Sequence, residues 1–161
     1  MSDFRVGSGF DVHAFAKNRK LTLGGVEIEY EFGLSGHSDA DVLVHAIIDA
    51  LLGAVGLGDI GGHYPDSNEA YRNISSMFLL ENTVLKVKSS GWSISNIDAT
   101  VIAQKPKLSA YLDKMRERLA GVLQIDRSRV NVKATTTEKL GFAGREEGIA
   151  ALAAAAVYKA I

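Results

Sequence analysis

The chain has no cysteine among its 161 residues, and this absence excludes disulfides, thiolate zinc sites and cysteine nucleophiles. It also has no excess of one charge, because 18 lysines and arginines are balanced by 19 aspartates and glutamates. We therefore expect no nucleic-acid partner and no attraction to an acidic membrane surface. No internal repeat, low-complexity run or linker-like stretch interrupts the pattern, which predicts a single domain over residues 1–161.

Long apolar runs are missing at both ends of the chain. Residues 1–7 have no apolar stretch of the signal-peptide type, and the alanine-rich residues 149–161 are too few to span a bilayer. We expect a cytoplasmic protein without a membrane partner. The alternative is a mature organellar protein, for example of the plastid stroma, from which a transit peptide has been removed.

What the chain does contain is a concentration of polar groups in His37-Ser38-Asp39-Ala40-Asp41-Val42-Leu43-Val44-His45. These nine residues hold two of the four histidines. Apolar residues then recur at helical spacing, which predicts a helix over residues 39–55. Ser38 or Asp39 is expected to cap this helix by accepting from its free first-turn amides.

The other segments have strand-like alternation or helical spacing. We expect strands at residues 4–13, 92–104 and 130–134, a hairpin at 21–28, and helices at 75–88 and 109–123, the last capped by Ser109. The alanine-rich segment after Gly144 is expected to form a final helix that packs closely on the sheet. This order predicts an α/β (α+β) sandwich, with a mixed β-sheet and helices packed on one face.

Asp11, His13 and His45 are candidate metal ligands. Asp11 and His13 are two apart on a strand and so point to one face, while Asp41 and His45 share one edge of a helix. One oxygen and two imidazole nitrogens form a ligand set that zinc accepts. The alternative from spacing alone is that Asp11 is a turn residue and the histidines are ordinary hydrogen-bonded edge residues.

Three further stretches suit a phosphorylated ligand. His37-Ser38 precedes a helix N-terminus, and Thr135-Thr136-Thr137-Glu138 combines hydroxyl donors with a carboxylate for a hard cation. The glycine-rich loop at residues 56–66 allows close backbone approach to a ligand, with Asp59 as an acceptor for sugar hydroxyls. Each also has a plain structural interpretation as a cap, a strand end or a helix-ending loop. Arg145 could clamp an oxyanion or lie on the surface, and His63 is interpreted as a surface residue.

Five motifs resemble one known family. They are Gly9-Phe10-Asp11-Val12-His13, His37-Ser38-Asp39-Ala40-Asp41, Leu57-Gly58-Asp59-Ile60-Gly61, Ala103-Gln104-Lys105-Pro106-Lys107 and Lys133-Ala134-Thr135-Thr136-Thr137-Glu138-Lys139-Leu140-Gly141-Phe142. In this order they resemble the 2-C-methyl-D-erythritol 2,4-cyclodiphosphate synthases. The resemblance implies cyclisation of 4-diphosphocytidyl-2-C-methyl-D-erythritol 2-phosphate with loss of CMP, in the non-mevalonate isoprenoid pathway. The substrate then supplies its own nucleophile, and the protein supplies positioning and charge neutralisation.

The resemblance also assigns roles to residues. It implies Zn²⁺ or another divalent transition metal at Asp11, His13 and His45, Mg²⁺ or Mn²⁺ at Glu138, and transition-state stabilisation by His37 and Thr136. Asp41 becomes support for a ligand imidazole. A homotrimer is implied, with each active site between subunits. The remaining substrate-binding positions are Ser38, Asp59, Gly61, Tyr64, Asp66, Asn68, Ala103, Lys107, Leu108, Thr135, Thr137, Phe142 and Arg145.

Two other functions stay open at this point. The same metal ligands could activate water in a zinc-dependent phosphohydrolase of nucleotide diphosphates. The chain could also be a non-catalytic module that binds cytidine nucleotides or metal ions.

Overall fold

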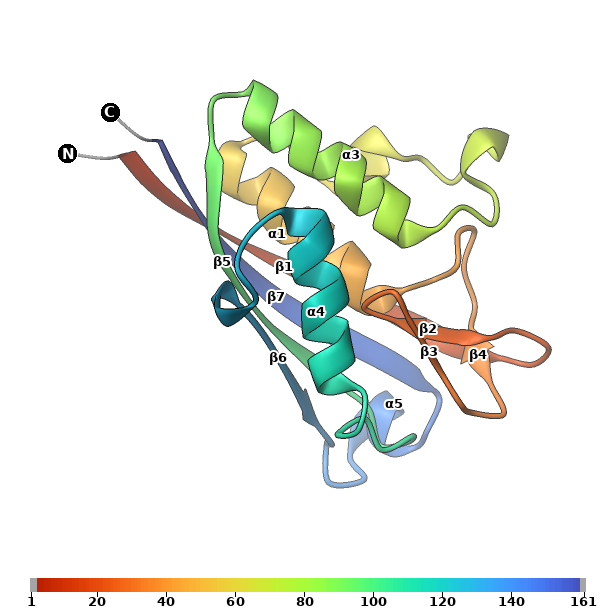
Figure 1. Ribbon diagram of the computed structural model, residues 1–161. Coiled ribbons are helices and arrows are strands. Elements are labelled where there is room, and N and C mark those ends of the chain that lie inside the picture. Colours follow the sequence, from red (N-terminus) through yellow and green to blue (C-terminus); the bar gives the residue numbers. More distant parts are fainter. Residues whose placement is uncertain (1–2, 160–161) are drawn as a thin grey trace.

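The computed structural model describes residues 3–159 and is built on one mixed five-stranded sheet (Figure 1). Its strands follow the order β4 (Gly33–Leu34), β1 (Asp3–Ala16), β7 (Gly148–Lys159), β5 (Ser93–Ile102) and β6 (Val130–Thr135). The pairing of β5 with β6 is parallel and the other pairings are antiparallel. The predicted hairpin is present as β2 (Leu21–Leu23) and β3 (Val26–Ile28), joined by a turn with positive φ at Gly24 and Gly25.

Three long helices, α1 (Val42–Val55), α3 (Ser76–Ser89) and α4 (Leu112–Leu123), lie on one face of this sheet (Figure 1). The predicted α/β sandwich with helices on one face is therefore confirmed. Short helical turns that the sequence did not predict complete the fold: α2 (Ile60–His63), α5 (Gly141–Gly144) and 3₁₀ turns at Glu69–Tyr71 and Arg127–Arg129. Within residues 3–159, no helix has both the length and the apolar character needed to cross a membrane.

Helix α1 lies directly on β1 and β7 because the sheet residues beneath it are small. A Cβ atom on Gly9 would lie 1.9 Å from the carbonyl oxygen of Ala46, and one on Gly7 would lie 2.1 Å from that of Ala50. The β7 side chains on this face are mainly alanines. This close packing places His45 of α1 next to the strand that carries Asp11 and His13.

The final helix predicted after Gly144 is wrong: the alanine-rich segment is strand β7, and Ala160 and Ile161 lie outside the described residues. Alanine has the highest intrinsic helix propensity, but propensity is a weak preference that tertiary pairing overrides. Here β7 pairs along its length with β1 and β5, so both edges of its backbone are hydrogen-bonded. Exposed Leu152 and Ala154 alternate with buried Ala151, Ala153 and Ala155, as successive residues of a strand do.

Two predicted helix caps are also wrong. Helix α1 begins at Val42 and is capped by Asp41, whose carboxylate accepts from the amide of Val44, so neither Ser38 nor Asp39 caps it. Helix α4 begins at Leu112 with Tyr111 in the capping position, and Ser109 precedes it. In both cases a turn between the predicted and observed start uses polar residues that resemble a cap in sequence.

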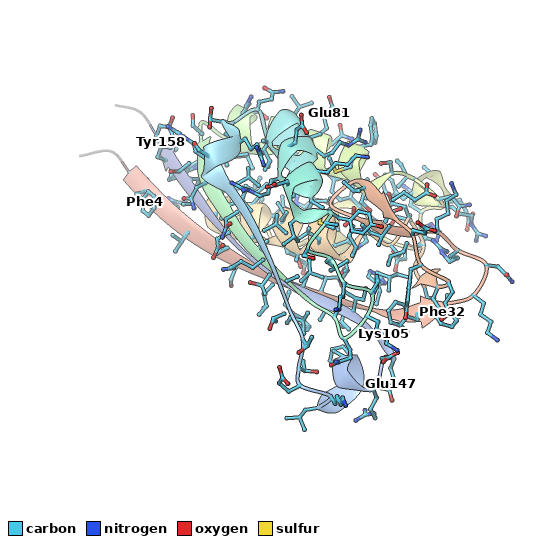
Figure 2. All side chains as sticks on the ribbon, turned by 60° about the horizontal axis from the view of Figure 1, so that its bottom comes forward. Phe4, Phe32, Glu81, Lys105, Glu147 and Tyr158 are labelled. Carbon is cyan, nitrogen blue, oxygen red and sulfur yellow. The ribbon has the colours of Figure 1, made fainter. Side chains whose placement is uncertain are left out.

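The sheet face opposite the helices exposes apolar side chains within the described chain. Val6 and Phe10 of β1 are 70% and 53% exposed, and Phe4, Val12 and Leu152 are also exposed. In Figure 2, Phe4 of β1 lies away from Glu81, which belongs to α3 in the helical layer. A contiguous apolar surface of this kind is typical of an interface.

Candidate functional site

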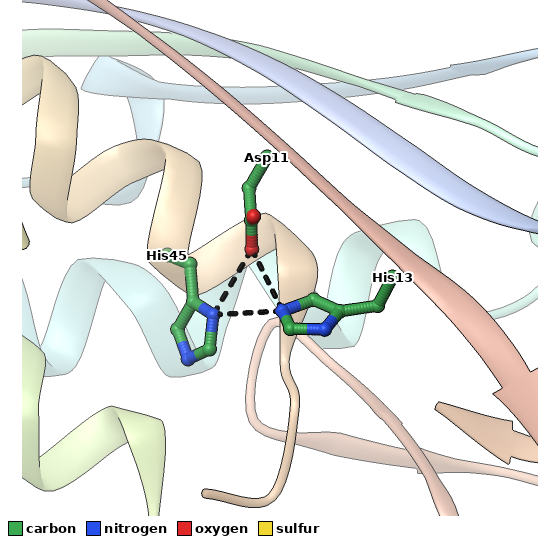
Figure 3. Close-up of side chains that lie close together, drawn as sticks. All are labelled: Asp11, His13 and His45. Carbon is green, nitrogen blue, oxygen red and sulfur yellow. Dashed lines mark hydrogen bonds and ion pairs between the residues drawn. The ribbon is translucent and has the colours of Figure 1, made fainter. Parts of the chain in front are cut away.

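Asp11, His13 and His45 converge at one point (Figure 3). The Asp11 Oδ2 atom lies 3.0 Å from His13 Nε2 and 3.0 Å from His45 Nδ1, and these two nitrogens are 3.2 Å apart. Zinc bonds of about 2.0–2.1 Å at tetrahedral angles place neighbouring donor atoms about 3.3 Å apart. The three donors therefore fit a small divalent cation. Within residues 3–159, this is the one cluster of His, Asp and Glu side chains with such spacing.

The second nitrogen of each histidine is also held. His13 Nδ1 donates to the carbonyl oxygen of Ser35 at 2.6 Å, which leaves Nε2 as the atom that faces Asp11 and His45. His45 Nε2 lies 2.8 Å from the Ser76 hydroxyl and 3.2 Å from that of Ser38. Both rings are therefore fixed in orientation by partners outside the ligand set.

The charges in the cluster reinforce one another. Burial alone would raise the pKa of Asp11, but hydrogen bonds with His13 and His45 hold that pKa well below its usual range. Burial alone would lower the pKa of His13, and its hydrogen bond and charge interaction with Asp11 raise the pKa instead. A cation bound between these donor atoms would take the place of the hydrogen bond that now joins His13 to the carboxylate.

The cluster lies in a cavity of about 350 Å³. Eight of the predicted site residues line this cavity, and Pro65 and Tyr71 line it with them. The eight are Asp11, His13, His37, Ser38, His45, Gly61, Tyr64 and Asp66. The walls come from β1, the loop before α1, α1 itself and the α2 region. Tyr64 is largely buried, and its hydroxyl bonds to Thr83 and to the Leu79 carbonyl oxygen.

A second cavity of about 240 Å³ lies where β5 and β6 end. Five other predicted site residues line it: Ala103, Lys107, Leu108, Thr135 and Thr136. The two cavities share no lining residue. The predicted site residues that line a cavity therefore fall into two groups within one chain.

The other predicted residues line neither cavity. Asp59 caps α2 by accepting from the Gly62 amide, and Asn68 caps a 3₁₀ turn while its carbonyl oxygen lies 3.3 Å from His37 Nε2. The loop after β6 is exposed: Thr137 donates to the Leu140 carbonyl oxygen, and Thr136 donates to Glu138 at 3.3 Å. Phe142 is exposed in α5, and Arg145 pairs with Glu147. His63, interpreted as a surface residue, is half-buried and contacts the Leu57 carbonyl oxygen.

Asp41 does not support a ligand imidazole, and that prediction is wrong. Its side chain is completely buried and accepts from the backbone amides of Gly24, Gly25 and Val44. Burial raises the pKa of Asp41 to about 6, against the lowering effect of these hydrogen bonds. Asp41 therefore joins the β2–β3 hairpin to the start of α1.

Two residues that the sequence did not single out, Ser76 and Arg19, contact the site, together with Asp39, which was predicted only as a helix cap. Ser76, completely buried at the start of α3, contacts His45, and Asp39 accepts from the Ser76 hydroxyl and amide. Arg19 donates to the carbonyl oxygens of Gly36 and Ser38, at 3.0 and 2.6 Å, and so fixes the loop that carries His37. A short apolar-to-polar change at a helix start, Ile74-Ser75-Ser76, was the available signal for Ser76.

Comparison with known proteins adds a family to this geometry. The family model described as "YgbB family" matches residues 4–158. The 2-C-methyl-D-erythritol 2,4-cyclodiphosphate synthase of Geobacillus sp. (strain WCH70) is 55% identical over 156 residues, which are 97% of this chain and 99% of that protein. The synthase of Thiobacillus denitrificans is 58% identical over 151 residues, 94% of each chain.

Solved structures agree with these relatives. The bifunctional IspDF of Campylobacter jejuni matches 99% of this chain with a TM-score of 0.96 and 48% identity, and the match spans 43% of that longer chain. The CDP complex of IspF from Plasmodium falciparum matches with a TM-score of 0.86 and 34% identity, covering 98% of this chain and 97% of that one.

Proposed function

The chain belongs to the YgbB family, with 2-C-methyl-D-erythritol 2,4-cyclodiphosphate synthases as its relatives, and from this we infer how its residues serve the reaction. It is a lyase of the non-mevalonate isoprenoid pathway that forms the cyclic diphosphate. One observation locates this activity in the structure. Asp11, His13 and His45 converge in a cavity that His37 and Ser38 also line.

We propose that the substrate is 4-diphosphocytidyl-2-C-methyl-D-erythritol 2-phosphate. An oxygen of its 2-phosphate forms a bond to the β-phosphorus, and the bond from that phosphorus to the bridging oxygen breaks. CMP leaves with the electron pair on its α-phosphate, so no water is consumed. The chain's task is to hold both phosphates in line and to neutralise their charge, as in other phosphoryl transfers.

Each group of residues has a part in this reaction. Asp11, His13 and His45 hold Zn²⁺ or another divalent transition metal, which polarises the β-phosphate when bound. Glu138 contributes a carboxylate for Mg²⁺ or Mn²⁺. His37, Ser38 and Thr136 donate to phosphate oxygens, His37 and Thr136 where charge develops. The residues left to hold the base, ribose and methylerythritol are Asp59, Gly61, Tyr64, Asp66, Asn68, Ala103, Lys107, Leu108, Thr135, Thr137, Phe142 and Arg145.

We propose that the protein is a homotrimer with active sites between subunits. The separation of the two cavities in one chain supports this, because a single substrate requires both groups of residues. The exposed apolar face around Phe10 and Val6 provides the surface that the subunits would bury. The expected cytoplasmic or organellar location stays a prediction.

Placing a charge on this face is expected to dissociate the trimer. Phe10→Asp would bury an unpaired carboxylate in an apolar interface, which costs several kcal/mol per site. Sedimentation velocity should then show monomers, with CMP release reduced more than tenfold because each site is incomplete. Phe78→Asp is the matched control, since Phe78 is about equally exposed but lies on α3 in the helical layer. A Phe10→Asp protein that remains trimeric would contradict the proposed interface.

Product analysis in ¹⁸O-labelled water tests the reaction itself. Cyclisation predicts one CMP per cyclic diphosphate and no ¹⁸O in either product, because the nucleophile comes from the substrate. The zinc-dependent phosphohydrolase would instead incorporate the label into a phosphate product. A metal-loaded preparation that binds CDP in calorimetry but does not turn over the substrate would indicate the non-catalytic module. That result would refute the proposed enzyme activity.

A further inference from the structure

A chain of hydrogen bonds leads from His45 to a carboxylate outside the ligand set. His45 Nε2 lies 2.8 Å from the Ser76 hydroxyl oxygen, and that hydroxyl bonds to Asp39 Oδ1. Asp39 Oδ2 also accepts from the Ser76 backbone amide at 3.1 Å. Ser76 is completely buried, so its hydroxyl has protein partners in place of solvent.

The chemistry of these groups fixes the direction of every proton in the chain. A carboxylate only accepts hydrogen bonds, so the Ser76 hydroxyl donates to Asp39. The lone pairs of Ser76 Oγ then face His45, and Nε2 must carry a hydrogen to bond with them. A neutral imidazole with hydrogen on Nε2 has its free lone pair on Nδ1. Nδ1 is the atom that faces Asp11 and His13.

We propose that Asp39 and Ser76 are positioning residues that hold His45 in the tautomer and orientation required of a metal ligand. The proposal rests on the metal site of the proposed function and extends it to two residues outside the ligand set. Ser38, 3.2 Å from the same nitrogen, is a weaker second acceptor. Asp39 fixes the direction of the Ser76 hydrogen bond, and Ser76 in turn fixes which nitrogen of His45 carries the hydrogen.

Zinc affinity measured by competition with a chromophoric chelator tests this directly. Loss of a hydrogen-bond partner of a ligating histidine typically lowers metal affinity about 10–100-fold. We expect a loss of that size in Ser76→Ala, and restoration in Ser76→Thr, which keeps the hydroxyl. In Asp39→Asn the amide can donate to Ser76 and reverse the chain, so we also expect weaker zinc binding.

Because Asp39 acts on His45 only through Ser76, the double variant Asp39→Asn, Ser76→Ala should bind zinc no more weakly than Ser76→Ala alone. Thr83→Val is the matched control: Thr83 is another completely buried hydroxyl of α3, but it bonds to Tyr64 and the Leu79 carbonyl oxygen. This variant should keep wild-type zinc affinity.

The proposal is overturned if Ser76→Ala binds zinc as tightly as the wild type, if Thr83→Val weakens binding equally, or if the double variant is additive. Wild-type CMP release without zinc binding would refute the metal site and this proposal but leave the cyclisation intact. Zinc binding that depends on Ser76, in a wild type that forms no cyclic product, would support the positioning role and contradict the activity.

Discussion

His45→Ala is expected to lose both zinc and turnover. The substitution removes one of three ligand side chains, leaving Asp11 and His13 as an incomplete set. A bound metal ion contributes several kcal/mol of charge stabilisation to a phosphoryl transition state. Each 1.36 kcal/mol corresponds to a factor of ten, so CMP release should fall by roughly 10³-fold. Elemental analysis for zinc and a CMP-release assay on the same preparation measure the two losses together.

A control variant must show that zinc is lost because His45 is removed, and not because any histidine is replaced. His63→Ala removes a histidine of α2 whose ring contacts the Leu57 carbonyl oxygen and no ligand of the cluster. It should retain one zinc per chain. If His45→Ala folds and keeps stoichiometric zinc, the assignment of His45 as a ligand is wrong.

The members of the candidate metal site were predictable from sequence because two periodicities place them. Asp11 and His13 are two apart, and a strand places such residues on one face whatever its neighbours are. His45 belongs to an apolar helical pattern that fixes which face of α1 meets the sheet. Spacing alone left open whether the three side chains meet, and the motif resemblance supplied that expectation.

The positioning residues were not predictable, because tertiary packing alone brings them to His45. Ser76 is 31 residues from His45 in sequence, and it reaches the ring because α3 packs on α1. Asp39 resembled a cap for α1, but the turn at Ala40, with φ of 57°, directs its carboxylate to α3 instead. The local sequence predicts a polar turn before α1. The packing of α3 determines that Asp41 caps α1 and that Asp39 accepts from Ser76.

The strand β7 was mispredicted for a related reason. Its alanines favour a helix in isolation, and the evidence for a strand lay in its partners, Gly7 and Gly9 on β1 and the close approach of α1. Small residues on β1 and β7 form the surface of the sheet on which α1 packs. The composition that suggested a helix packing on the sheet was a property of the sheet itself.

This surface leads to the second large effect, expected for Gly9→Ala. A methyl group there would lie 1.9 Å from the Ala46 carbonyl oxygen and 2.8 Å from the Ala50 amide nitrogen, so α1 must move away from β1. Overpacking of this kind typically costs about 1–3 kcal/mol, and contact with backbone atoms that cannot rotate away favours the upper end. Urea unfolding of the metal-stripped protein should show a loss of about 3 kcal/mol.

The same displacement should weaken metal binding, because Gly9 is two residues from Asp11 and Ala46 follows His45. Moving α1 separates the His45 nitrogen from the Asp11 carboxylate, now 3.0 Å apart, whereas zinc tolerates little change in ligand spacing. Gly53→Ala is the matched control, because a methyl group there has its nearest contact at 4.0 Å and alanine favours the helix. That variant should be at least as stable as the wild type and bind zinc normally. Equal stability of Gly9→Ala and the wild type would show that α1 does not depend on the glycines of this surface, and the link between packing and ligand geometry would fail with it.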